Sequence, residues 1–165
     1  MELKNIGLED TKYGDILCVN SSHLAGLTIR LFTESPIDHV AACIGNDKII
    51  EALPKGVSKN SIFNYNTARW CLLRPSRKYL RLTTKQRENG LVWLEKQIGA
   101  AYDWFGIISF IFRKNIGERK KWYCTELVQK WYKAMGIRLI ERSDGLINPH
   151  PLYCSPLLSL VGSKS

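Results

Sequence analysis

Two short apolar segments separated by two polar residues constrain the fold of this chain more than any other feature. Residues 38–45 (DHVAACIG) and 48–53 (KIIEAL) flank the dipeptide Asn46-Asp47. A two-residue polar break between two strand-like runs is typical of a β-hairpin. The chain is therefore expected to build an antiparallel sheet around this hairpin.

Other segments predict the rest of an α+β fold, an antiparallel sheet packed against helices. Residues 13–20 are expected to form a Gly14-Asp15 turn that leads into a first strand. Further strands are expected at 56–58 and at 69–74, the latter ended by Pro75. Helices are expected at 21–32, at 124–135, and from Thr83 or Thr84 to about Ile98, with Leu91, Leu94 and Ile98 on one face. The apolar segment 101–112 is expected to be a buried helix or helical turn. The tail from Ile137, with three prolines, is expected to be irregular but packed.

Length and composition favour one globular domain over residues 1–165. The chain has 165 residues, of which 45% are hydrophobic and 10% aromatic. These are enough apolar residues to form a packed core, so extensive disorder is not expected. The formal net charge of +9 favours association with anionic partners, and weak binding to an anionic membrane is one such association. A solvated basic face is the plainer reading. Dedicated nucleic-acid binding is not expected, because no nucleic-acid-binding motif is present.

The cysteines indicate reduced thiols. There are five, an odd number at wide spacings without a CxxC, so neither a disulfide framework nor a structural metal site is expected, and no cofactor is predicted. The first residues hold no apolar signal-peptide core, which favours a cytoplasmic location. The longest apolar stretch, 104–112, is too short to span a bilayer.

Cys124 is the candidate nucleophile. It follows Trp122 and Tyr123 at the start of a predicted helix, where unpaired backbone N–H groups and the helix dipole favour a thiolate over a thiol. A thiolate is the form of cysteine that attacks a carbonyl carbon. A buried structural thiol is the plain alternative, because cysteine often behaves as a small hydrophobic residue.

His39 and Glu51 are the candidate partners of this thiol. His39 lies near the start of a predicted strand, a rigid support for a base, whereas His23 and His150 lie in weaker contexts. Glu51 is a charged residue between apolar neighbours in the next strand, so its carboxylate can accept a hydrogen bond from the imidazole. A surface histidine and a water-facing glutamate are the plain alternatives.

Several stretches carry a family resemblance by their order. They are the Gly14-Asp15 turn before the first strand, DHVAACIG, IIEAL followed by GV, and YCTELV opening a helix. In this order they resemble the circularly permuted papain-like amidases, the YaeF/YiiX group of the NlpC superfamily, from Gly14 to about Met135. In ordinary papain-like enzymes the cysteine helix precedes the histidine strand. The resemblance implies that the histidine-first order here is the permutation.

The resemblance also implies roles for the matched residues. Cys124 corresponds to the nucleophile at a helix N-terminus, His39 to the base and Glu51 to the polar third member. Tyr102-Asp103 corresponds to a pair that lines the pocket.

Other residues near the signature have less definite roles. Thr125 and Glu126 belong to the nucleophile signature, and Glu126 is expected to be a capping or network residue rather than a catalyst. The backbone N–H of Cys124 would hold the oxyanion, and Tyr13 and Tyr102 are candidates for the second donor.

Three functions remain open at this point. The first is a cysteine hydrolase that cleaves an amide bond in a small peptide or cell-wall-derived substrate through an acyl-enzyme. The second is a lipid acyltransferase or thioesterase, similar to the lecithin:retinol acyltransferase branch of the superfamily, which the basic charge and the apolar segment 104–112 would suit. The third is a binding domain with an inert site.

Overall fold

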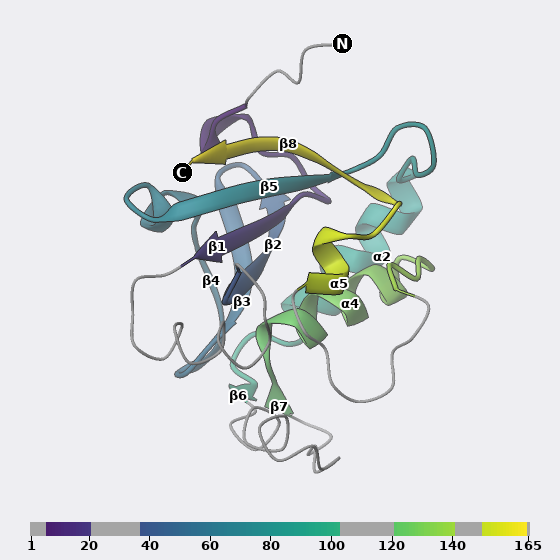
Figure 1. The fold of residues 1–165 in the computed structure, drawn as a ribbon. Coiled ribbons are helices and arrows are strands. Elements are labelled where there is room, and N and C mark those ends of the chain that lie inside the picture. Colours follow the sequence, from purple (N-terminus) through teal and green to yellow (C-terminus); the bar gives the residue numbers. More distant parts are fainter. Residues whose placement is uncertain (1–5, 21–36, 103–120, 141–149, 165) are drawn as a thin grey trace.

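Antiparallel pairing builds the main sheet, as the hairpin predicts. The computed structural model describes residues 6–20, 37–102, 121–140 and 150–164. Within them, six strands pair side by side in the order β4-β3-β2-β1-β5-β8 (Figure 1). They are β1 (Ile16–Asn20), β2 (His39–Gly45), β3 (Lys48–Leu53), β4 (Gly56–Ser61), β5 (Arg69–Pro75) and β8 (Leu158–Lys164). Each neighbouring pair runs antiparallel.

The predicted hairpin is confirmed as β2 and β3. Asn46 and Asp47 form its turn with φ angles of 50° and 57°. Positive φ at both central residues matches the right-handed twist of the flanking strands, and asparagine and aspartate tolerate it better than most side chains. The strand predicted at 56–58 is longer than expected, because β4 continues to Ser61 opposite β3.

The tail departs most from the prediction. Instead of being irregular, it contains the short helix α5 (His150–Tyr153) and the strand β8, which pairs with β5 and extends the sheet. Pro156 comes before the first residue of β8, so it removes no hydrogen bond from the ladder. The prolines were therefore misleading, since they limit where a strand can begin but do not exclude one.

The predicted helix after residue 83 is confirmed, but it ends early. In α2 (Thr84–Glu95), Thr83 is the N-cap and forms a capping box with Gln86. The helix stops before Ile98, whose side chain is 43% exposed, so Ile98 does not share the buried face of Leu94. The spacing of Leu91, Leu94 and Ile98 predicts a helical face, but it does not indicate whether the rest of the protein extends far enough to cover Ile98.

The apolar segment predicted as a helix at 101–112 begins as a strand. Residues 101–102 form β6 (Ala101–Tyr102), which pairs in parallel with β7 (Lys121–Trp122), immediately before α4 (Cys124–Ala134). The parallel partner of β6 lies 20 positions later in the chain, so the residues around β6 carry no sequence pattern that predicts the pairing. The remainder of that predicted helix and the helix predicted at 21–32 lie outside the described residues.

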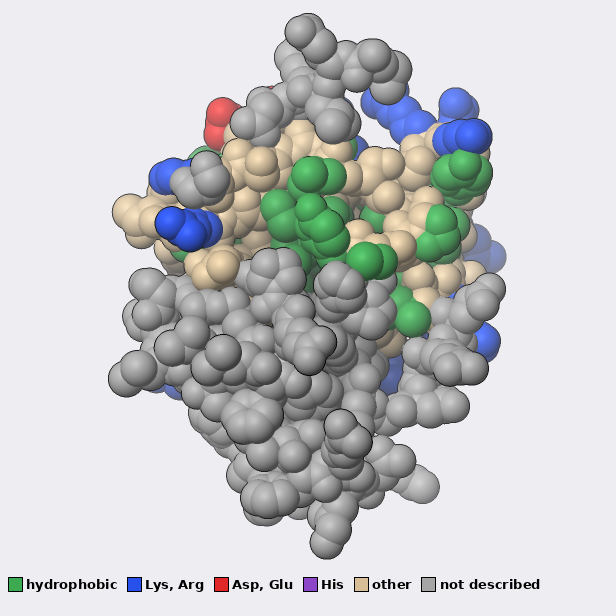
Figure 2. All heavy atoms as spheres, in the orientation of Figure 1, with side chains coloured by type: hydrophobic (Ala, Val, Ile, Leu, Met, Phe, Trp, Pro, Cys, Tyr) green, Lys and Arg blue, Asp and Glu red, His purple; other side chains and the backbone are tan. Residues whose placement is uncertain are grey.

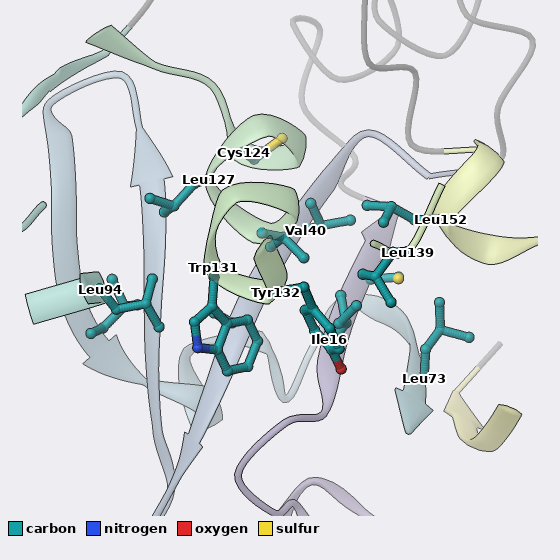
Figure 3. Close-up of a cluster of buried hydrophobic side chains, with 14 of the residues drawn as sticks. Ile16, Val40, Leu73, Leu94, Cys124, Leu127, Trp131, Tyr132, Leu139 and Leu152 are labelled. Atoms are coloured by element: carbon teal, nitrogen blue, oxygen red, sulfur yellow. The ribbon is translucent and has the colours of Figure 1, made fainter. Parts of the chain in front are cut away.

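The sheet is buried on both faces. Alternate residues of β1 enter two different clusters: Ile16 and Cys18 face the helices, whereas Leu17 and Val19 face the short 3₁₀ segments η1 (Leu8–Asp10) and η2 (Ile62–Tyr65). On the helix side, α4 packs against β2 and β3, and α2 packs against α4. Trp131 is among the largest side chains of this core (Figure 3).

A buried ion pair ties the first turn to β5. Arg74 donates hydrogen bonds from Nε and Nη2 to the two carboxylate oxygens of Asp15, at 2.8 and 2.7 Å. The Asp15 side chain is 1% exposed, and the backbone N–H of Lys12 also donates to it. The stability of this buried carboxylate depends on the positive charge of Arg74, because water cannot reach Asp15 to compensate if that charge is removed.

Replacing Arg74 by alanine is therefore expected to destabilise the fold by about 3–5 kcal/mol, since it leaves the buried Asp15 carboxylate unpaired. Urea unfolding followed by circular dichroism measures this loss. Lys59→Ala is the matched control: Lys59 and Glu95 form an exposed pair at 3.8 Å, and its loss should cost less than about 1 kcal/mol. Equal losses in the two variants would contradict the importance of the buried pair.

Candidate active site

Cys124 is the first residue of α4, after the N-cap residue Tyr123. Its side chain is 7% exposed and lies in the same core as Leu127 and Trp131 (Figure 3). Val128 belongs to this core too. These buried side chains hold the helix against the sheet, so the start of α4 is fixed in place. The structure thus places Cys124 at a helix N-terminus, as the sequence predicts.

His39 is the first residue of β2, and its side chain is 14% exposed. It is hydrogen-bonded to the side chain of Cys124. Its Nε2 donates a second hydrogen bond to Oε2 of Glu51, at 2.6 Å. Because Glu51 takes Nε2, the ring nitrogen left for Cys124 is Nδ1. The three residues expected to act together therefore form one hydrogen-bonded chain.

The register of the hairpin explains how Glu51 reaches His39. Ala42 pairs with Ile50 across β2 and β3, and continuing this antiparallel register puts Ala41 opposite Glu51. His39 is two residues farther along β2, so it lies on the same face at the diagonal position. Long side chains at diagonal positions can touch. The carboxylate does not face water, since Glu51 is only 1% exposed.

Two residues that sequence reasoning missed also bind this carboxylate. Asn60 donates from Nδ2 to Oε1 of Glu51 at 2.9 Å, and the Tyr65 hydroxyl donates to Oε2 at 2.6 Å. The Tyr65 ring also stacks on the His39 ring, with centroids 5.9 Å apart. These contacts hold Glu51 in one orientation, so the network positions the imidazole as well as the carboxylate.

The sequence contained a signal that Asn60 lies beside Glu51, but it contained none for Tyr65. β4 pairs with β3 so that Ser58 lies opposite Glu51, which makes Asn60 its diagonal neighbour. Extending the predicted third strand by two residues would have revealed this. Tyr65 reaches the site from η2, after the sheet strand has ended, and no local periodicity indicates that placement.

The electrostatics of the network favour charged forms of both partners. Burial lowers the pKa of His39, but hydrogen bonds and opposite charge from Cys124 and Glu51 outweigh it and raise the pKa to about 10. Burial raises the pKa of Glu51, but the hydrogen bonds and charge of His39, with Tyr65 and Asn60, bring it below its ordinary value. Burial and the Glu51 charge raise the pKa of Tyr65, which therefore stays a hydrogen-bond donor. A pKa of about 10 favours the imidazolium form of His39 at neutral pH.

Tyr13 contacts Trp131 and Met135. Its hydroxyl accepts a hydrogen bond from Nε1 of Trp131 at 3.0 Å and lies 3.8 Å from the Met135 sulfur. Trp131 is seven residues beyond Cys124, which is about 10 Å along a helix at 1.5 Å per residue. Tyr13 therefore contacts the later part of α4, and its role as a second oxyanion donor stays a prediction.

The other predicted residues are placed in part. The backbone of Tyr102 in β6 pairs with Trp122, which precedes Cys124 by two residues, so β6 lies beside the chain that enters α4. Asp103 lies outside the described residues. Thr125 is the second residue of α4 and is 1% exposed, which places it in the packed base of the site.

Comparisons with known proteins identify one similar sequence and one similar fold. No protein-family model matches the sequence. The chain is 25% identical to the "Probable lipoprotein peptidase YaeF" of Escherichia coli K12 over 184 aligned positions, which cover 91% of this chain and 65% of that protein. It also resembles the crystal structure of the metalloprotein YiiX from Escherichia coli O157:H7, with a TM-score of 0.72 and 20% identity, covering 93% of this chain and 97% of that one. The chain is thus similar to YaeF in sequence and to YiiX in fold, which supports the predicted likeness to the YaeF/YiiX group.

The likeness to YiiX confirms the α+β fold with its antiparallel sheet. The chain spans 65% of the length of YaeF.

In the described part of the chain, no three His, Cys, Asp or Glu side chains gather where they could hold a metal ion. No helix among those same residues is long and apolar enough to cross a membrane.

Proposed function

We propose that this chain belongs to the YaeF/YiiX group and is a cysteine hydrolase that cleaves an amide bond in a small peptide or cell-wall-derived substrate. Cys124 is the nucleophile, His39 the base and acid, and Glu51 the residue that orients the imidazole. The observation that carries this proposal is the hydrogen-bonded chain from Cys124 through His39 to the buried Glu51. The word peptidase in the name of YaeF, which belongs to that protein, supports the same class.

The proposed reaction follows from the protonation states. His39 holds the proton of Cys124, so the thiolate attacks the amide carbonyl carbon and a C–S bond forms. As the C–N bond breaks, Nδ1–H of His39 gives its proton to the leaving amine, and the acyl-enzyme remains. His39 then removes a proton from water, whose oxygen attacks the acyl carbon and releases the acid and the thiolate.

Glu51 contributes through His39. Its carboxylate accepts the Nε2–H bond, so it fixes the tautomer that leaves Nδ1 facing sulfur and stabilises the imidazolium. The backbone N–H of Cys124, unpaired at the helix start, is the proposed first donor to the oxyanion. Tyr102 stays a candidate for the second donor.

The chain order supports a permuted papain-like arrangement. The strand that carries His39 comes before the helix that carries Cys124, which is the reverse of the order in ordinary papain-like enzymes. We infer that the same spatial site is reached here with the two halves of the fold exchanged in sequence.

A substrate panel tests the proposal. Purified protein is incubated with short peptide amides, including a bacterial cell-wall tripeptide, and separately with phosphatidylglycerol vesicles, and the products are identified by mass spectrometry. We expect release of amine from a peptide amide and no acyl transfer from the phospholipid. Acyl transfer from the vesicles without amide cleavage would instead assign the chain to the lecithin:retinol acyltransferase type.

Thiol labelling distinguishes an enzyme from an inert binding domain. A Cys154→Ser protein removes a cysteine whose side chain is exposed, so that iodoacetamide labelling at pH 6 reports on the remaining thiols. We expect Cys124 to be alkylated first, because it is hydrogen-bonded to His39 and lies at a helix N-terminus, the surroundings in which reactive cysteines are found. Slower labelling of Cys124 than of Cys71 would contradict a catalytic thiol.

A further inference from the structure

Two other thiols face each other in the sheet, on the side that α4 covers. Cys18 in β1 and Cys71 in β5 are direct partners in the antiparallel register. Cys18 belongs to the same buried cluster as Cys124, and Cys71 packs against that cluster. The thiols of Cys18 and Cys71 are hydrogen-bonded to each other. None of the chain's cysteines, all of which are described, is in a disulfide.

The register allows these two sulfur atoms to be joined. Directly opposed residues of antiparallel strands have Cα atoms about 4.5–5.5 Å apart. Disulfides span Cα separations of about 4.4–6.8 Å. Cys43 provides a contrast, because it is buried in the cluster on the opposite face and pairs with Ile49. Of these buried and half-buried thiols, the geometry therefore singles out Cys18 and Cys71.

We propose that Cys18 and Cys71 form a reversible disulfide when the protein meets a peroxide, and that this bond acts as a redox-sensitive lock beside the candidate active site.

The chemistry assigns different roles to the two thiols. Cys71 is partly exposed and therefore the one that peroxide reaches, whereas Cys18 is 1% exposed. The hydrogen bond from Cys18 lowers the pKa of Cys71 although burial opposes it, and the same bond raises the pKa of Cys18. Cys71 is thus the thiolate that attacks and Cys18 the thiol that resolves.

The reaction balances with one peroxide. The Cys71 thiolate attacks a peroxide oxygen, so an S–O bond forms, the O–O bond breaks, and the leaving hydroxide becomes water by taking a proton. The Cys18 sulfur then attacks the Cys71 sulfur, which forms the S–S bond and breaks the S–O bond. The second hydroxide takes the Cys18 proton and also leaves as water. Two thiols are oxidised and one peroxide is reduced.

The bond would act on the site through β1. The residue after Cys18 is Val19, which pairs with His39, and Cys18 itself pairs with Val40 in β2. Opposed Cβ atoms lie about 4.5–5.5 Å apart in a sheet, whereas a disulfide holds them at about 3.5–4.5 Å. Closing the bond therefore draws β1 about 1 Å toward β5 and away from the strand that carries His39. This consequence rests on the proposed function, whereas the formation of the bond does not.

Peptide mapping tests the disulfide independently of activity. Cys124→Ala protein is treated with one equivalent of hydrogen peroxide, alkylated, digested without reductant and analysed by mass spectrometry. We expect a Cys18–Cys71 linked peptide that dithiothreitol removes, and its absence in Cys71→Ser but not in Cys43→Ala protein. Oxidation of Cys71 to a sulfinic acid, or both thiols remaining reduced, would overturn the proposal.

Activity measurements test the lock. Displacements near 1 Å can lower turnover about 100-fold, so an activity loss of up to about that size is expected on oxidation, with recovery in dithiothreitol. Cys71→Ser protein should resist this reversible loss, and Cys43→Ala should not. Equal reversible loss in the wild type and in Cys71→Ser would show that the bond, even if formed, does not act on the site.

Discussion

Cys124→Ala protein is expected to hydrolyse a peptide amide about 10⁴- to 10⁶-fold more slowly than the wild type. The variant keeps the buried position but removes the sulfur that forms the acyl-enzyme, and removing a catalytic nucleophile has effects of this size. The change is measured as kcat/KM with the peptide amide that the wild type cleaves best. A mass increase by the acyl group in the rapidly quenched wild type, absent in the variant, would identify the intermediate.

Cys154→Ala is the matched control for this loss, since it removes an exposed thiol from the same chain. Its kcat/KM should stay within about twofold of the wild type, as expected for a surface change away from the site. Far-ultraviolet circular dichroism establishes that Cys124→Ala remains folded. Hydrolysis by a folded Cys124→Ala protein at more than about one hundredth of the wild-type rate would exclude Cys124 as the nucleophile.

The pH dependence of turnover is expected to shift when Glu51 is replaced by glutamine. Activity requires the proton on His39, so it is lost as the pH rises through the His39 pKa, which is about 10 in the wild type. Glutamine removes the negative charge that helps raise this pKa. The alkaline limit should therefore move down by about one to three pH units, toward the ordinary histidine value. At neutral pH, kcat/KM should fall by about 10²- to 10⁴-fold because the imidazole also loses its orienting partner.

Glu88→Gln provides the control for this shift, because Glu88 is exposed on α2 and its removal changes the net charge equally. The profile is measured as kcat/KM from pH 5 to 11, with circular dichroism at each pH to identify any unfolding. An alkaline limit that stays near pH 10 in Glu51→Gln would show that the carboxylate does not set the protonation of His39. A shift of the same size in Glu88→Gln would assign the effect to net charge instead.

Much of the candidate site follows from local sequence. The Asn46-Asp47 break specifies a hairpin, and the hairpin places His39 and Glu51 on one face at diagonal positions. The start of α4 at Cys124 follows from the helical spacing of Leu127, Val128 and Trp131. These features depend on residues a few positions apart, where turn geometry and helical periodicity act directly.

What local patterns missed depends on partners that are distant in sequence. The strand β8 exists because β5, more than 80 positions earlier, offers an edge to pair with. Tyr13 packs against Trp131, which is distant from it in sequence. Tyr65 completes the Glu51 network from η2, and neither its spacing nor its neighbours indicate this.

By itself, the sequence determined the hairpin, the helix that begins at Cys124 and the residue types able to make a thiolate–imidazolium pair. Only the tertiary structure decided that the Cys124 sulfur contacts the His39 ring and that Asn60 and Tyr65 bind Glu51. It also decided that β8 extends the sheet beyond β5. The reason is physical. Backbone propensity and side-chain periodicity are set by near neighbours, whereas contacts between separate elements are chosen by the burial of surfaces that come together only when the whole chain has folded.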